Sequence, residues 1–464
     1  MRRALAAIAA AASALSPLGT LGCAEPVRNG ARPDVLLVTV DTLRADHLSS
    51  YGFPLETSPR IDAFAADAVV FERAIAGSSA TVPSHASILT SRYTRGHSVG
   101  YGNGESRLED VETLAGVFRE AGYATGAFVS NFLLQRRIGL DRGFDVYDDD
   151  LPSAELNRAS YFERIAEQTA ARALEWLGEV EGEPFFLWVH FQDPHGPYAP
   201  PARYRGRFQV PPAPDERPLP VLDDNSGLAG IPVYQALEGM SLPSVYRSRY
   251  ADEIYYADHS IGALIEAVDA RSSPHGAVVL LTADHGESLG EEGRFFVHAV
   301  TTPDVAHVPM ILRAPGLLPG RRREVAHHVD VMPTLLELAD LDAPVGVRGL
   351  AWGPFLRGEK PIPRRLVYCD IGAELSAYGG DRFVRVLDVR GAWESDGDAG
   401  GHGVAPFWAR YTWNADGSWA LERAGGGLDD EIRGYLHKAI PMAKAQSPGR
   451  GFVERLRALG YTED

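Results

Sequence analysis

Five short apolar runs, each bounded by turn residues, constrain the fold more than any other feature of the sequence. They span residues 35–40, 124–129, 185–191, 277–281 and 308–312, and helical patterns separate them. Continuous apolar runs of this length are typical of strands that are buried on both faces, and intervening helices supply the crossovers that parallel strands need. The pattern therefore predicts an α/β fold, in which a mostly parallel central sheet has helices on both faces.

The segments between these runs predict the helices and the domain organisation. Residues 161–180 and 251–268 carry apolar residues at helical spacing, and Asp110 and Gly122 are suited to opening and closing a third helix. We expect residues 34–365 to form the larger domain, with the Pro- and Gly-rich segment 197–245 as a long loop insertion. Strand-like pieces at 382–389 and 411–421 and a helix at 452–459 predict a small C-terminal α+β subdomain over residues 366–464.

The first 33 residues predict an address outside the cytoplasm. Arg2 and Arg3 precede an Ala- and Leu-rich stretch that is too short to span a bilayer, so residues 1–22 are interpreted as an export signal. Gly22 and Cys23 resemble a bacterial lipoprotein cleavage site, which favours a lipid anchor on Cys23 over plain secretion. We therefore expect residues 23–33 to tether a protein of the bacterial cell envelope to the membrane; otherwise it would be periplasmic or secreted.

The charge of the chain argues against a partner that is itself a large polyanion. The formal net charge is -17 and the isoelectric point is near 5.3. A nucleic acid would be repelled by this charge, so no nucleic-acid partner is expected.

Polar residues stand at the ends of four of the five apolar runs. In an open α/β sheet the carboxyl ends of the parallel strands meet at one edge, where ligands bind. Two carboxylates and an imidazole at such an edge form a suitable site for a divalent cation, although each Asp alone could equally be a turn residue or a helix cap. The residues are Asp41, then Ser130 with Asn131, then Gln192, Asp193 and His195, and finally Asp284 with His285.

The segment TVPSHASILTSRY predicts a helix with a hydroxyl at its positive end. Pro83 fits the first turn of a helix, which leaves Thr81 near backbone N–H groups that have no partner within the helix. A hydroxyl in this position can be activated for attack on an anionic group that the same donors hold. The alternative interpretation is a Thr that only caps a short core helix.

Taken together and in order from about residue 34 to 339, these segments resemble the sulfatases and their relatives in the alkaline phosphatase superfamily. The resemblance is carried by VTVDTLRADHLSSYG, TVPSHASILTSRY, HFQDPHGPYAPP, TADHGESLGEEG, HVPMIL and VDVMPTLLELA. It implies that Thr81 is the nucleophile and that His195 assists at the leaving group. It also implies a divalent metal held by Asp41, Thr81, Asp284 and His285.

Three departures from the sulfatase pattern bear on the chemistry. The family's nucleophile is a Cys or Ser that is converted to formylglycine, which Thr81 cannot become, and His85 stands where an Arg is expected. The lysines that grip sulfate are missing, because no lysine precedes Lys360. Thr42 replaces the second Asp of the first metal motif. The resemblance then offers His298, and Ser130 with Asn131, as the counterparts that contact the substrate.

With a threonine as nucleophile, the site resembles that of the phosphodiesterase and phosphotransferase relatives of the sulfatases. This resemblance favours a phosphorus ester over a sulfate ester as the substrate. The predicted partner is therefore an anionic ester. There are two alternatives. The chain could be a phosphotransferase that transfers the group to another acceptor at the cell envelope, or a catalytically silent lipoprotein that binds an anionic glycan. His85 and His298 are further catalytic candidates, and His190 is either a substrate contact or a buried hydrogen-bonded residue. Calcium, magnesium, manganese and zinc all suit one imidazole among oxygen ligands.

Overall fold

The computed structural model describes residues 32–97, 99, 107–108, 110–180, 182–271, 273–371, 375–379, 382–386, 407–413 and 419–426. The predicted export signal, Cys23 with most of the tether, and the predicted helix 452–459 lie outside the described residues. Within the described part of the chain, no helix combines the length and the apolar character needed to cross a membrane.

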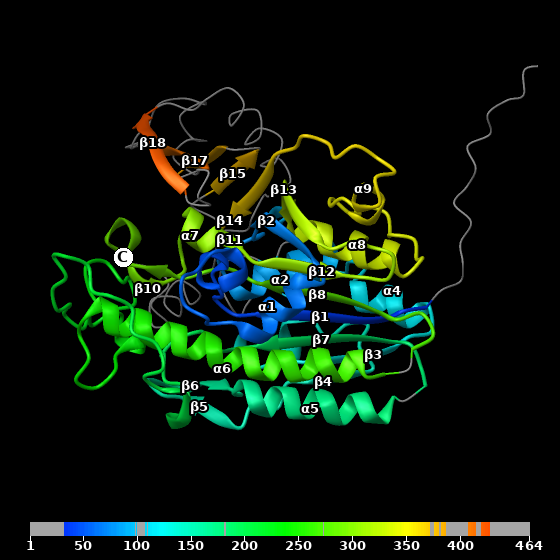
Figure 1. Cartoon of the computed structure of the whole chain (residues 1–464), viewed down its shortest axis with the longest axis horizontal. Coiled ribbons are helices and arrows are strands. Elements are labelled where there is room, and N and C mark those ends of the chain that lie inside the picture. The colour runs from blue at the N-terminus through cyan, green and yellow to red at the C-terminus, as the bar shows by residue number, and fades with distance from the viewer. Residues whose placement is uncertain are drawn as a thin grey trace, which may run out of the picture.

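A nine-stranded sheet forms the centre of the protein (Figure 1). Its strands follow the order β11-β2-β12-β8-β1-β7-β3-β4, and β13 also pairs with β2. The five strands from β8 to β4 in this order are parallel, whereas β12 runs antiparallel between β8 and β2. The α/β fold with a mostly parallel sheet is thus confirmed. The bounds are β1 Asp34–Val40, β2 Val69–Ile75, β3 Ala124–Phe128, β4 Val146–Asp148, β7 Phe185–Phe191, β8 Ala277–Ala283, β11 His307–Val308, β12 Met310–Arg313 and β13 Gly320–His327.

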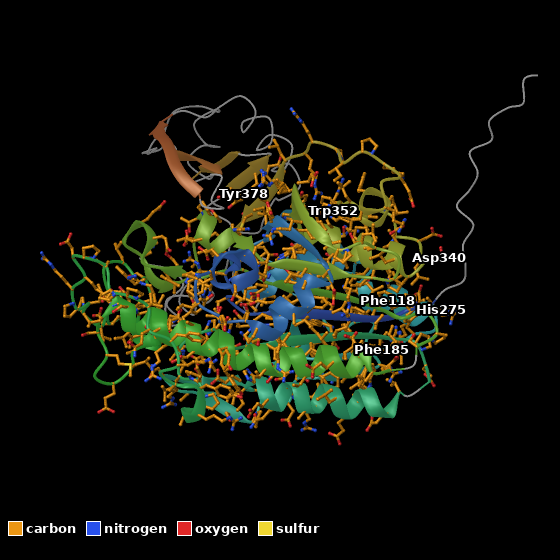
Figure 2. All side chains as sticks on the ribbon, viewed as in Figure 1. Phe118, Phe185, His275, Asp340, Trp352 and Tyr378 are labelled. Carbon is orange, nitrogen blue, oxygen red and sulfur yellow. The ribbon has the colours of Figure 1, made fainter. Side chains whose placement is uncertain are left out.

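Two neighbouring residues of β7 show that helices cover both faces of the sheet. Phe186 stacks on Phe118 of helix α4 (Leu114–Glu120), with ring centroids 4.7 Å apart, whereas Phe185 meets Trp176 of helix α5 (Ala166–Glu179) edge to face at 6.2 Å. Successive side chains of a strand point to opposite faces, so α4 and α5 lie on opposite sides of the sheet. Figure 2 labels Phe118 and Phe185.

The remaining helices join one of these two layers. Helix α4 (Leu114–Glu120) is accompanied by α2 (Thr81–Thr90) and α8 (Val331–Leu338), and α5 (Ala166–Glu179) by α6 (Pro243–Asp269), on which α1 (Pro59–Ala66) packs (Figure 1). Close packing of α5 requires Gly126 in β3, because a Cβ there would lie 2.8 Å from the Trp176 ring. Short elements fill the connections: α3 Thr94–His97, α7 Pro303–Ala306, α9 Gly353–Leu356, β9 Ser288–Leu289 and β10 Phe295–Val297.

The structure corrects several predicted element bounds. The first residues of the predicted helix 161–180 belong to strand β6 (Arg158–Glu163), which pairs with β5 (Ser153–Glu155) in a hairpin, and α5 begins only at Ala166. Helix α6 begins at Pro243, earlier than predicted, because proline suits the first turn of a helix. Thr113, and not Asp110, caps α4, since its Oγ1 accepts the Gly116 N–H at 3.1 Å.

The predicted strand 308–312 is interrupted by Pro309, which lies between β11 and β12. A proline has no N–H to donate to a strand ladder, so one apolar run becomes two short strands. Both run antiparallel to β2, although the run was expected to belong to the parallel part of the sheet.

The last described strands form a separate antiparallel sheet in the order β14-β15-β16-β17-β18. The predicted piece 382–389 contains β16, whereas the piece 411–421 covers the end of one strand and the start of the next. This sheet contacts the segment before α2, because the Ser78 hydroxyl donates to the Asp370 carbonyl at 2.8 Å. The bounds are β14 Val367–Asp370, β15 Leu375–Gly379, β16 Arg382–Val386, β17 Phe407–Trp413 and β18 Trp419–Gly426.

Candidate active site

The carboxyl ends of β1 and β8 bring three of the predicted metal ligands together. Asp41 follows β1, and Asp284 and His285 follow β8, which lies next to β1 in the sheet. All three side chains are fully buried, and one potential ligand atom of each lies within 4.8 Å of the others. His275, labelled in Figure 2, precedes β8 and therefore lies at the amino end of this strand, away from Asp284 and His285 at its carboxyl end.

Hydrogen bonds fix the two carboxylates so that one oxygen of each stays unpartnered. Asp284 Oδ1 accepts the N–H groups of Thr42 at 3.2 Å and of His285 at 2.8 Å, while its Oδ2 has no partner among the described residues. Asp41 Oδ2 accepts from Asn131 Nδ2 at 2.9 Å, and its Oδ1 is likewise unpartnered. Thr42 takes a φ of 52°, a strained conformation for a β-branched residue that aims its N–H at Asp284.

The ring of His285 is oriented as a metal ligand. Its Nδ1 donates to the Gly286 carbonyl at 3.0 Å, so in the neutral ring Nε2 carries a lone pair. Burial, and then the charge of His298, lower the pKa of His285 to about 3, which keeps the ring neutral. Nε2 lies 3.5 Å from Asp284 Oδ2, and because Nε2 carries no proton in this tautomer, the two atoms do not form a hydrogen bond. A cation bound here would satisfy all three unpartnered atoms, and the donor set therefore fits a divalent metal.

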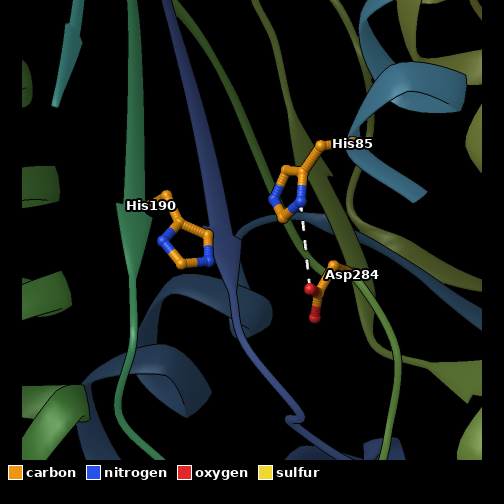
Figure 3. A group of neighbouring side chains, drawn as sticks. All are labelled: His85, His190 and Asp284. Carbon is orange, nitrogen blue, oxygen red and sulfur yellow. Dashed lines mark ion pairs between the residues drawn. The ribbon is translucent and has the colours of Figure 1, made fainter. Parts of the chain in front are cut away.

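A second cluster, His85, His190 and Asp284, also has ligand atoms close together (Figure 3). Figure 3 shows His85 facing Asp284, with a separation of 3.8 Å from Nδ1 to Oδ2. Both nitrogens of His85 are already hydrogen-bonded, Nδ1 to the Thr81 carbonyl at 2.7 Å and Nε2 to the Thr39 hydroxyl at 3.0 Å. These bonds favour Asp41, Asp284 and His285 as the cation site. They also join the start of α2 to Thr39 of β1, and a catalytic role of His85 stays a prediction.

His190 lies close to Asp41, and a hydrogen bond of its own fixes its ring. Its Nδ1 accepts the Ser130 N–H at 3.4 Å, so the proton of the neutral ring is on Nε2, which lies 3.6 Å from Asp41 Oδ2. Burial lowers the pKa of His190 to about 3. The Ser130 hydroxyl donates to the His190 carbonyl at 2.6 Å, and Asn131 Oδ1 accepts the Leu133 N–H at 2.8 Å. Direct substrate contact by Ser130, Asn131 or His190 stays a prediction.

Thr81 is the first residue of α2, as the position of Pro83 predicts. The start of this helix is fixed against the carboxylate cluster, because the Ser84 hydroxyl donates to the Asp284 carbonyl at 2.6 Å. The side chain of Thr81 is 2% exposed. Its hydroxyl is at the positive end of a helix whose first turn is joined to Asp284 through Ser84.

Two further histidines line the site. The rings of His285 and His298 stack with centroids 4.5 Å apart, and His195 lies 5.5 Å from His298. His195 and His298 are 8% and 7% exposed, and Nδ1 of each has no hydrogen-bond partner in the described part of the chain. Burial lowers the pKa of His195 well below its usual range and that of His298 to about 4. Both are thus neutral rings beside the predicted metal ligands.

Comparison with known proteins decides the family. The sequence profile of the family described as Sulfatase matches residues 33–341, which include the whole of this cluster. The chain belongs to the sulfatase family. It is therefore a sulfatase-like ester hydrolase, and members of the sulfatase family generally use a divalent metal.

Individual relatives of this sulfatase chain are distant. An uncharacterized sulfatase, YidJ, of Escherichia coli is 26% identical over 68% of this chain and 69% of its own. An arylsulfatase of Clostridium perfringens is 24% identical over 71% of this chain and 81% of its own. The solved phosphonate monoester hydrolase of Agrobacterium radiobacter shares the fold with a TM-score of 0.63 at 18% identity, covering 89% of this chain and 95% of its own.

The structure adds to the sulfatase site a carboxylate that the sequence analysis missed. Glu287 is fully buried, both its oxygens are unpartnered among the described residues, and Oε1 lies 3.4 Å from His298 Nδ1. Burial, and then the charge of Asp41, raise the pKa of Glu287 well above its usual range. Its place in the motif TADHGESLGEEG, two residues after His285, was the available signal. Arg158, in the hairpin of β5 and β6, was missed as well.

Proposed function

We propose that this sulfatase-family chain cleaves an anionic ester through a covalent intermediate on Thr81, and that a phosphorus ester is preferred over a sulfate ester. The observation that carries the proposal is the hydroxyl of Thr81 at the start of α2, which Ser84 fixes against Asp284. A threonine cannot be oxidised to formylglycine, so the hydroxyl itself has to attack. The lack of lysine before Lys360 supports a preference other than that of true sulfatases.

The residues divide the reaction as follows. A divalent cation held by Asp41, Asp284 and His285 supplies positive charge that lowers the pKa of the Thr81 hydroxyl and neutralises the transferred group. The Thr81 hydroxyl gives up its proton as the bond from Oγ1 to phosphorus forms and the bond from phosphorus to the leaving oxygen breaks. His195, a neutral ring in the resting protein, assists by passing the proton that Thr81 loses to that departing oxygen. Water then cleaves the ester on Thr81 and restores the hydroxyl.

A panel of substrates tests the preference. Aryl sulfate, phosphate monoester, phosphate diester and phosphonate monoester are assayed with calcium, magnesium, manganese and zinc. We expect kcat/KM for the best phosphorus ester to exceed that for the sulfate by at least about tenfold, which corresponds to roughly 1.4 kcal/mol of transition-state binding. Thr81→Ala protein, purified in the same way, controls for contaminating phosphatases. A sulfate ester as the fastest substrate contradicts the preference.

We further propose that the protein is exported and anchored by a lipid on Cys23. This proposal is supported by Arg2, Arg3 and the apolar stretch before Gly22. Cys23→Ala is expected to move the protein from the membrane fraction to the soluble fraction, because a thiol at this position is the acceptor of the lipid. Cys369→Ala, made in parallel, should leave the fractionation unchanged. Wild-type protein that is soluble and keeps the residues before Cys23 contradicts the anchor.

A further inference from the structure

The hairpin of β5 and β6 places an arginine on the ring of Tyr234, which packs on His195 of the candidate site. Asn157 at its turn donates to the carbonyls of Tyr234 and Ala236, each at 2.8 Å, which joins the hairpin to the long loop 197–245. Arg158 is the next residue, and its guanidinium lies 4.5 Å from the centre of the Tyr234 ring and 4.2 Å from that of Tyr161. The side chain is 14% exposed, so it is held in place yet reached by solvent.

A path of ring contacts locates Arg158 relative to the metal ligands. The Tyr234 ring lies 6.0 Å from that of His195, and the rings of His195, His298 and His285 follow one another at 5.5 and 4.5 Å. Arg158 is thus connected to the candidate cation site through Tyr234, His195 and His298.

The charge of Arg158 is close enough to act on His195. The guanidinium lies over the Tyr234 ring at 4.5 Å, and that ring stacks on His195 at 6.0 Å. Burial lowers the pKa of His195 well below its usual range, and the positive charge of Arg158 lowers it further.

The site needs such a cation. Three carboxyl groups, those of Asp41, Asp284 and Glu287, are buried here among neutral histidines, and an anionic ester has to enter. Arg44, whose charge reaches Glu287, is bound by Asp46 and Glu291 at 2.7 and 2.8 Å. No lysine precedes Lys360.

We propose that Arg158 binds the anionic group of the ester substrate and that Glu155 holds the guanidinium in position until the substrate enters. The proposal rests on the proposed ester hydrolysis and names a residue that recognises the anion. Arg158 Nε and Nη2 donate to the two oxygens of Glu155 at 2.8 and 2.6 Å. Glu155 thus orients the arginine and also competes with the incoming anion for its charge.

A purely structural clamp makes a different prediction from an anion site. If Arg158 and Glu155 only join the hairpin to the loop, removing either partner loosens this contact. Both changes should then weaken phosphate binding. If Arg158 binds the anion, loss of Arg158 weakens binding, whereas loss of the Glu155 charge strengthens it. The two variants should therefore move the affinity in opposite directions.

The experiment measures the dissociation constant of inorganic phosphate for metal-loaded protein in a Thr81→Ala background, by calorimetry. Arg158→Met should weaken binding by about tenfold to a hundredfold, the usual effect of losing a hydrogen bond to a charged group. Arg158→Lys should recover part of this loss, and Glu155→Gln should tighten binding. The matched control is Arg137→Met, an exposed arginine 4.3 Å from the Phe132 ring, which should leave the constant unchanged.

Equal weakening by Arg158→Met and Glu155→Gln, or no change in Arg158→Met, overturns the proposal. If Arg158→Met does not fold, Arg158→Lys and Glu155→Gln decide the matter by the signs of their effects. Because phosphate binding needs no turnover, the two proposals fail separately. Opposite effects in a protein that cleaves none of the panel esters contradict the hydrolysis and leave the anion site in place.

Discussion

Thr81→Ala is expected to lower kcat for the best panel substrate by about four orders of magnitude or more, as the loss of a nucleophile does in other covalent enzymes. The reason is that the attacking oxygen is lost, and the hydroxyl of Ser84 in the same first turn of α2 is already engaged, since it donates to the Asp284 carbonyl at 2.6 Å. The change removes only one methyl and one hydroxyl at the start of a helix, so the fold should be retained. Steady-state rates and thermal unfolding check the two parts separately.

Thr81→Ser is the matched control for this variant. Serine keeps the attacking oxygen and loses the methyl group that restricts its rotamer, so it should retain part of the activity. Mass spectrometry of quenched wild-type reactions should find a phosphoryl or sulfuryl group on Thr81. Wild-type turnover in Thr81→Ala would show that water attacks directly and that the covalent mechanism is wrong.

The sheet was predictable from the sequence because its central strands are buried on both faces. The run 185–191 coincides with β7. A largely apolar segment of this length, bounded by Glu-Pro and Gln-Asp, is typical of a strand that is buried on both faces of a parallel sheet. The start of α5 was not predictable in this way. Tyr161 is buried at a position that suits either a helix or a strand, and the hairpin contact between Glu155 and Arg158 decides for the strand.

The candidate site was predictable where strand ends define it. The α/β pattern predicts that Asp41 and Asp284 lie on the same side of the sheet, at the carboxyl ends of their strands, and the structure shows that they meet because β1 and β8 are neighbours. Arg158 could not be found in this way, because a loop far away in the sequence places it: Tyr234 packs on both His195 and the arginine. Glu287 could not be distinguished from an exposed acid, since its burial is a property of the folded chain.

Asp41→Asn and Asp284→Asn are each expected to abolish metal binding and activity together. In the metal-free protein it is unfavourable for both buried carboxyl groups to be ionised. Burial, and then the charge of Asp41, raise the pKa of Asp284 well above its usual range. Asparagine removes that charge at nearly constant volume, so the metal-free variants should fold at least as stably as the wild type. What they lose is the ligand that makes the cation favourable here.

The decisive readout is the gain in stability on adding metal. At a free metal concentration of about 100 times Kd, wild-type protein should gain roughly 2.7 kcal/mol, and each variant should gain much less. Asp258→Asn is the control, because Asp258 is as deeply buried but caps α1 by accepting the Ile61 N–H at 2.8 Å, away from this cluster. It should lose stability with and without metal and keep the full metal-dependent gain. Asp41→Asn or Asp284→Asn protein with wild-type metal content would refute the assignment of these ligands, since a cation without either carboxylate would leave its charge uncompensated in a buried site.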